Sequence, residues 1–123
     1  MAVAVIGFIA VFFLGMGIYA LAAPAALIRP FGITLGESAS RAEVRAVYGG
    51  FGLAIAGVLV YAAVAIGDLR MGILITVAAA LVGMAFGRLV SAVVDERTAF
   101  YPNWFYCIVE IIAGGALFGA AFS

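Results

Sequence analysis

Four long apolar stretches separated by short polar connections make up almost the whole chain. They cover residues 3–22, 41–66, 69–94 and 103–122. A helix of about 20 residues spans about 30 Å, which is the thickness of the hydrocarbon core of a bilayer. The pattern therefore predicts an all-α polytopic membrane protein, in which residues 1–123 form a single domain with four transmembrane helices in an antiparallel bundle.

Composition supports lipid as the solvent of this fold. Hydrophobic residues make up 68% of the 123 positions and charged residues only 10%. Soluble domains contain about 45–50% apolar and about 25% charged residues. A chain this short could not bury so much apolar surface within itself, so we expect the lipid bilayer to be its main partner.

Local signals predict where the helices begin and end. Pro24 should end the first helix, which we interpret as a retained span rather than a signal peptide because no basic residue precedes it. Ser40 and Glu43 fit a capping box, with Ser40 as the N-cap of the second helix. Gly67 suits a left-handed position after the second helix, and Asp68 can cap the third.

Small residues recur at four-residue spacing in three of the predicted helices. The pairs are Gly50 with Ala54, Gly83 with Gly87, and Gly115 with Gly119. This spacing allows two helix backbones to approach closely. We expect these pairs to pack inside the bundle; the alternative is a homo-oligomer that associates through the same glycine and alanine faces.

Several classes of function are disfavoured by composition. The chain has no histidine, one cysteine and a formal net charge of zero. Histidine is the commonest metal ligand and general base, and a single cysteine forms no intrachain disulfide or CxxC centre. Nucleic-acid binding requires a basic surface. We therefore predict no metal, no cofactor and no nucleic acid, and an enzyme is less expected than a non-catalytic protein.

Polar residues within the helices gather, by connectivity, in one half of the bundle. The first and third helices end, and the second and fourth begin, at one membrane face, here called side B; the other face is side A. We predict a ligand-binding polar cluster in the side-B half. Its members are Glu43, Arg45, Tyr48, Arg88, Ser91, Asp95 and Glu110.

Depth and energy both indicate that these groups face one another. Tyr48, Arg88 and Glu110 each lie seven residues, or about 10 Å, from the side-B end of their helices. A charge at the centre of a membrane helix costs roughly 2.5–3.5 kcal/mol on the insertion scale. Intramembrane charges therefore point inward, pair with one another and commonly mark functional sites.

The cluster admits three functions. In the first, Arg45 and Arg88 converge on the head of a small polar or anionic amphiphile, which the protein binds or transports. In the second, Arg88 and Glu110 only fix helix packing in a structural or accessory protein. In the third, which is the weakest, Glu110 or Asp95 is the acid/base group of a membrane-embedded enzyme.

These polar residues also carry a family resemblance. The stretch Glu43-Val-Arg-Ala-Val-Tyr-Gly-Gly50, then Gly87-Arg88-x-x-Ser91-x-x-x-Asp95, then Glu110, resembles an uncharacterised family of small bacterial four-helix membrane proteins described only as a domain of unknown function. The resemblance implies an inner-membrane protein whose matched polar residues belong to one site. It implies no known activity.

The remaining arginines predict the orientation in the membrane. Arg29, Arg41 and Arg97 lie at side B, against Arg70 at side A. Cytoplasmic loops carry the excess of basic residues. We therefore expect side B, with the polar cluster, to face the cytoplasm and both termini to lie outside.

Overall fold

The computed structural model describes residues 1–123 and contains only helices and connecting loops. Four helical segments are long and apolar enough to cross a membrane: Ala2–Ala22, Ser38–Val64, Asp68–Val94 and Phe100–Ala121. They start and end within three residues of the predicted spans. The all-α, four-helix membrane fold is thus confirmed.

Three of the four spans are divided or extended by shorter elements. The elements in chain order are α1 (Ala2–Ala22), α2 (Pro24–Ile28), η1 (Arg29–Phe31), α3 (Ser38–Val44), η2 (Arg45–Gly50), α4 (Phe51–Val64), α5 (Asp68–Val94), η3 (Phe100–Trp104) and α6 (Phe105–Ala121). The second span comprises α3, η2 and α4, and the fourth comprises η3 and α6. Both η2 and η3 are π-helical, with wider turns than an α-helix.

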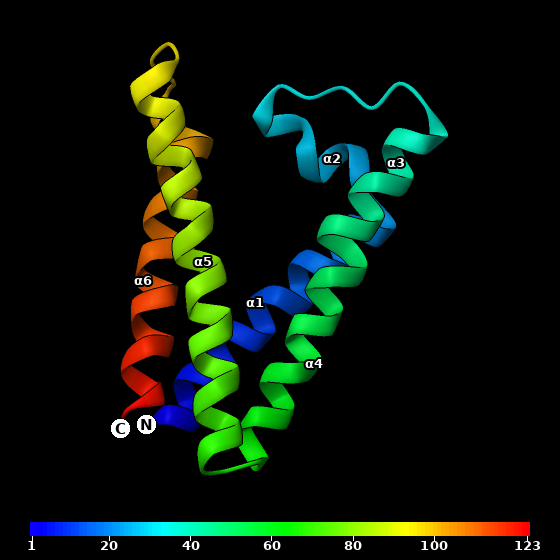
Figure 1. Cartoon of the computed structure of the whole chain (residues 1–123). Coiled ribbons are helices and arrows are strands. Elements are labelled where there is room, and N and C mark those ends of the chain that lie inside the picture. Colours follow the sequence, from blue (N-terminus) through cyan, green and yellow to red (C-terminus); the bar gives the residue numbers. More distant parts are fainter.

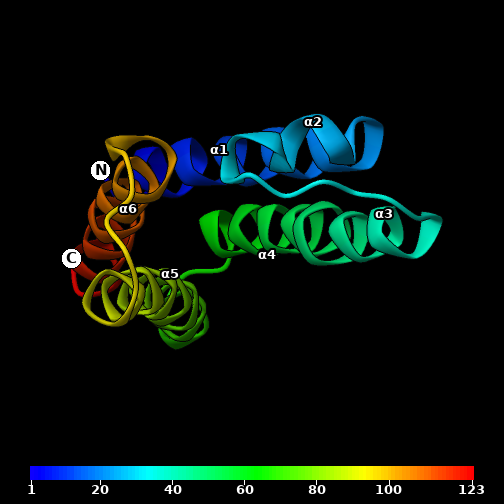
Figure 2. The ribbon, with the colours of Figure 1, turned by 90° about the horizontal axis from the view of Figure 1, so that it is seen from above.

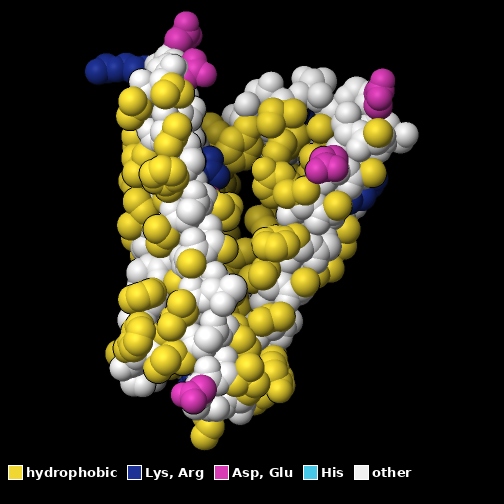
Figure 3. Space-filling model, viewed as in Figure 1, with side chains coloured by type: hydrophobic (Ala, Val, Ile, Leu, Met, Phe, Trp, Pro, Cys, Tyr) yellow, Lys and Arg dark blue, Asp and Glu magenta, His cyan; other side chains and the backbone are white.

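The four spans are arranged as two arms that form a V. In the first arm α1 packs against α4, and in the second α5 packs against α6 (Figures 1 and 2). The arms meet at side A, where both termini and the α4–α5 turn lie, and diverge toward side B (Figure 1). The space-filling view shows the molecule hollowed between the arms, with hydrophobic side chains on both walls (Figure 3).

One hydrophobic core holds the arms together, and it lies in the side-A half. It combines the beginning of α1, the end of α4, the beginning of α5 and the end of α6. Its buried members are Ile6, Ile9, Ala10, Phe13, Ala56, Leu59, Ala62, Leu74, Val77, Ala78, Leu81, Leu117 and Ala121. Arg70 also links the two arms, because its guanidinium on α5 donates hydrogen bonds to the carbonyls of Ala62 and Ala63 on α4, at 2.8 and 2.6 Å.

The helix starts correct two of the sequence predictions. The capping box at Ser40 is wrong, because α3 begins at Ser38 and the Glu37 carbonyl accepts the N–H of Arg41 at 3.2 Å. Asp68 is not an N-cap either. Gly67 occupies that position with a positive φ of 86°, and its carbonyl accepts the first bond of α5. Both helices start earlier than expected, because the carbonyl of the residue before the observed start (Glu37 or Gly67) already accepts the first hydrogen bond of the helix.

Close helix approach occurs at glycines other than the predicted pairs. A Cβ on Gly17 would lie 2.9 Å from the carbonyl oxygen of Gly49, so α1 and η2 touch through their backbones. A Cβ at the outer glycines would meet no atom within 4 Å; these are Gly83, Gly87, Gly115 and Gly119. The prediction that those pairs pack inside the bundle is wrong. The α5–α6 interface instead uses Gly114, where an added Cβ would lie 3.0 Å from the Val82 side chain and 3.2 Å from the carbonyl oxygen of Ala78.

Candidate functional site

The one ion pair in the molecule joins Arg88 of α5 to Glu110 of α6. Arg88 Nε donates to Glu110 Oε1 at 2.8 Å, and Nη2 donates to Oε2 at 3.0 Å. Two parallel bonds of this kind form the strong bidentate arrangement of a guanidinium and a carboxylate. The Glu110 side chain is only 6% exposed and that of Arg88 is 21% exposed. The two charges therefore neutralise each other within the membrane span.

The antiparallel packing of α5 and α6 sets this pairing. Arg88 lies about two turns before α5 ends, and Glu110 lies about one and a half turns after α6 begins. Cys107, one turn nearer side B than Glu110 on α6, places its buried thiol 3.9 Å from the carbonyl oxygen of Ala85 on α5. Equal depth on two adjacent helices was the basis of the predicted contact, and the structure confirms a buried ion pair.

Aromatic rings from both arms surround the Arg88 guanidinium. Its Cζ lies 5.8 Å from the ring centroid of Tyr106 on α6 and 5.8 Å from that of Phe31 in η1. The two rings are themselves 5.6 Å apart. Because η1 follows α1 and α2, Phe31 reaches the second arm from the first. This aromatic contact therefore connects the arms near side B, where the hydrophobic core does not extend.

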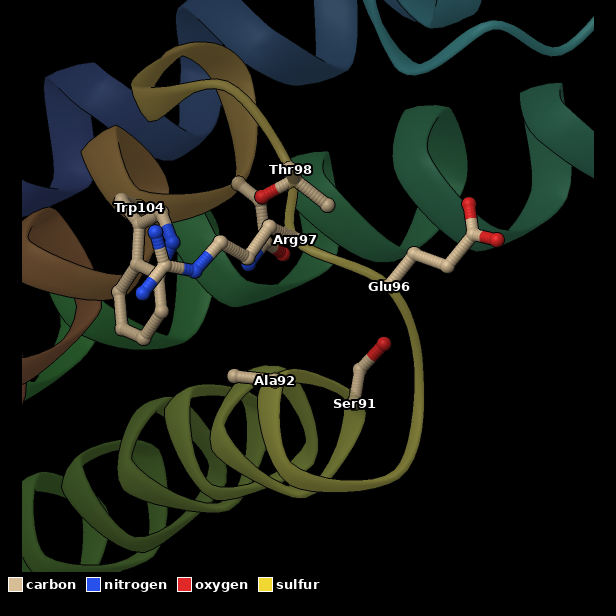
Figure 4. Close-up of a pocket in the computed structure, with 7 residues that line it drawn as sticks. Ser91, Ala92, Glu96, Arg97, Thr98 and Trp104 are labelled. Atoms are coloured by element: carbon tan, nitrogen blue, oxygen red, sulfur yellow. The ribbon is translucent and has the colours of Figure 1, made fainter.

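A polar pocket lies beside the ion pair at the side-B end of the second arm. It has a volume of about 340 Å³. The lining residues are Ser91, Ala92, Glu96, Arg97, Thr98, Asn103 and Trp104. Asn103 belongs to both features, since its Oδ1 accepts a bond from Arg88 Nη1 at 3.4 Å. Figure 4 shows Ser91 and Ala92 rising from α5 toward the segment that carries Arg97 and Thr98.

Of the other predicted site residues, two lie near Arg88. Tyr48 on η2 is half-buried and close enough to Arg88 for an electrostatic interaction, but no hydrogen bond joins them. Ser91 lines the pocket and is exposed. These two residues therefore belong to the surroundings of the ion pair.

The remaining three predicted residues lie elsewhere. Arg45 is exposed, and its Nε donates to the carbonyl of Leu21 at 3.0 Å. The Asp95 carboxylate accepts the backbone N–H of Glu96 at 2.8 Å. Glu43 is exposed and forms no ion pair. The predicted convergence of Arg45 with Arg88 is thus wrong.

Two physical reasons explain the position of Arg45. The π-helical turns of η2 begin at Arg45 and rotate residues 45–50 away from the phase of a continuous α-helix. In addition, Leu21 is one of the last residues of α1, and its carbonyl has no partner within that helix. The guanidinium satisfies this carbonyl instead of entering the space between the arms.

Several contributors were not identified as site residues from the sequence. Around the ion pair these are Phe31, Asn103 and Tyr106, and the pocket adds Ala92, Glu96, Arg97, Thr98 and Trp104. The clustering of aromatic residues around 101–106 was visible, but that pattern is also typical of a lipid–water interface. No sequence signal places Phe31 beside Arg88, since 57 residues separate them.

Fold and site together define a small multi-pass helical membrane protein with a buried arginine–glutamate pair. The chain belongs to the family described as "Domain of unknown function (DUF4345)", whose model matches residues 1–121. The resemblance to an uncharacterised family is thereby confirmed. No curated protein and no solved structure matches the chain.

Proposed function

We propose that this protein binds a small amphiphile, with the polar head beside Arg88 and Glu110 and the apolar part between the two arms. The observation that supports this proposal is the position of the ion pair. It lies outside the packed core, in the half of the molecule where the arms diverge, and Arg88 keeps part of its side chain exposed.

The chemistry of the opening matches an amphiphile. The walls between the arms are mostly hydrophobic (Figure 3), whereas the pocket next to Arg88 is lined mainly by polar side chains. Binding sites for small molecules combine apolar walls with a few polar groups that fix orientation. A guest with an apolar chain and a polar head would cover both surfaces at once.

The ion pair limits the number of Arg88 hydrogen-bond donors that remain free for the polar head of a ligand. A guanidinium has five N–H donors. Three of them are directed at Glu110 and Asn103, which leaves two for a guest. Because Glu110 already neutralises the charge, Arg88 contributes hydrogen bonds rather than net attraction for an anion. A polar head is therefore accommodated without displacing the carboxylate.

A structural or accessory role is the second candidate. It is favoured by the completeness of the pair, since both carboxylate oxygens of Glu110 are bonded and no buried side-chain polar atom lacks a partner. A pair of this kind can specify the register of α5 against α6 without contacting any ligand. No comparable observation favours an acid/base enzyme.

We place the protein in the bacterial inner membrane, with side B and the opening toward the cytoplasm. The distribution of arginines supports this orientation, because Arg29, Arg41 and Arg97 lie at side B and Arg70 lies at side A. An amphiphile would then enter with its head at the cytoplasmic leaflet.

Mass spectrometry of molecules retained after detergent extraction tests the proposed binding. Wild-type protein should retain an amphiphile, and the double variant Arg88→Met with Glu110→Leu should lose it while remaining folded. Arg29→Gln is the matched control, since it removes an exposed side-B arginine outside the site. Equal retention by the double variant and the wild type would leave the ion pair with a structural role only.

A further inference from the structure

The pocket beside Arg88 is lined by a second arginine, Arg97. We propose that the pocket holds a phosphate group and that Arg97 supplies the charge that binds it. The inference rests on the proposed function, because it specifies the head chemistry of the amphiphile. It also moves the anion-binding role from Arg45 and Arg88 to a residue outside the transmembrane helices.

The Arg97 guanidinium is available to bind an anion. The only ion pair in the structure joins Arg88 to Glu110, so Arg97 has no carboxylate partner. Glu96 is the one acidic residue among those lining the pocket. Figure 4 shows its side chain directed away from Trp104, whereas the Arg97 side chain extends toward Trp104. Arg97 is therefore the one cation among the lining residues, and it is free of a salt bridge even though Asp95 and Glu96 precede it in the chain.

The residues that line the pocket also provide free hydrogen-bond donors. Ser91, Thr98 and Trp104 line the pocket and donate no hydrogen bond within the protein. The side-chain oxygen of Asn103 is taken by Arg88, which leaves its amide N–H groups as donors. A cationic fork surrounded by neutral donors suits a phosphate, whose oxygens accept several charge-assisted bonds.

Arg97 lies nearer the membrane surface than Arg88 does. Arg97 lies three residues beyond the side-B end of α5, whereas Arg88 lies six residues before that end, about 9 Å deeper along the helix. The pocket is therefore at the level of lipid headgroups, and all its lining residues belong to the second arm and the loop that follows α5. A phosphate at this level coincides with the phosphates of the surrounding lipid, so an anionic phospholipid is the expected source.

Trp104 makes the pocket directly observable. It is the only tryptophan in the chain and one of the lining residues. In vesicles of phosphatidylcholine, a minor fraction of phosphatidylglycerol with brominated chains should quench Trp104 more strongly than the same fraction of brominated phosphatidylcholine. Arg97→Gln should weaken the preference for phosphatidylglycerol about tenfold, the loss expected for a charged hydrogen bond.

Arg29→Gln separates the pocket from general attraction to an anionic surface, because it removes the same charge from the same face. This control should retain the wild-type preference. An equal loss in both variants, or no preference in the wild type, would overturn the assignment.

Titration with inorganic phosphate in a zwitterionic detergent distinguishes the two sources of the group. A saturable change in Trp104 fluorescence that Arg97→Gln abolishes would support a phosphate site filled by a soluble compound. Saturation with the lipid alone would support a phospholipid. If neither probe depends on Arg97 while amphiphile retention still depends on Arg88 and Glu110, the head assignment fails and the proposed function stands.

Discussion

Arg88 and Glu110 lie on adjacent antiparallel helices and share two hydrogen bonds, of 2.8 and 3.0 Å, in the half of the bundle that lacks a hydrophobic core. The pair crosses the α5–α6 interface and is in contact, through Phe31, with the other arm. Its removal should therefore affect both the second arm and the connection between the arms.

The stability of the protein should depend on the ion pair between Arg88 and Glu110. Arg88→Ala leaves Glu110 buried without a partner and should lower the free energy of unfolding by about 3–5 kcal/mol. The double change Arg88→Met with Glu110→Leu should recover most of this loss, since no buried charge remains. Unfolding in mixed detergent and dodecyl sulfate measures both values. A double variant no more stable than either single variant would contradict a direct pairing energy.

The aromatic contact between the arms should respond to Phe31→Ala. This change removes the ring from Arg88 and from Tyr106 and should cost about 1–2 kcal/mol. Spin labels at Ser38→Cys and Glu96→Cys should then show a broader distance distribution across side B. Phe122→Ala is the control, because its ring partner Phe118 belongs to the same arm, on α6, and the contact does not cross between the arms. Equal broadening in both variants would mean that Phe31 does not hold the arms.

Glycine substitutions distinguish inner from outer helix faces. Gly17→Ala should destabilise the protein by about 1–3 kcal/mol, because the added methyl group would lie 2.9 Å from the Gly49 carbonyl and 3.0 Å from the backbone of Leu53. Gly83→Ala should cause no loss, since that position faces open space. Thermal unfolding of the two purified variants in detergent compares them. The opposite ranking would require a different rotation of α5.

The outer glycines retain a predicted role in self-association. Gly83 and Gly87 are four residues apart on a face of α5 that contacts nothing within the chain. Such spacing favours close pairing of two membrane helices. If this face forms a homo-oligomer, Gly87→Ile should shift the mass of the detergent-solubilised particle to that of a monomer. A wild-type particle that is already monomeric in bilayer nanodiscs would exclude this interface.

Orientation in the membrane is tested by fusion to the C-terminus. With side B in the cytoplasm, Ser123 lies outside, so a reporter that is active only in the cytoplasm should be inactive there. The same reporter inserted between Gly36 and Glu37, in the side-B loop, should be active. The reverse pattern would place the opening between the arms on the outside.

The sequence by itself determined the spans and the ion pair. Long apolar stretches set the number and approximate ends of the helices, because only a helix satisfies its own backbone in lipid. The contact between Arg88 and Glu110 also followed from the sequence. Each charge is too costly to face lipid, and both residues lie seven positions from the side-B ends of their predicted helices, which gives them equal depth.

Only the tertiary structure decided how the helices are rotated and how far the arms separate. Rotation decided that Arg45 bonds to Leu21 rather than facing Arg88, and that Gly17 rather than Gly83 lies at a helix crossing. Lipid and apolar side chains are chemically alike, so hydropathy does not distinguish an outer face from an inner one. Packing shape makes that distinction, and shape depends on contacts between residues far apart in the chain, such as Phe31 with Tyr106.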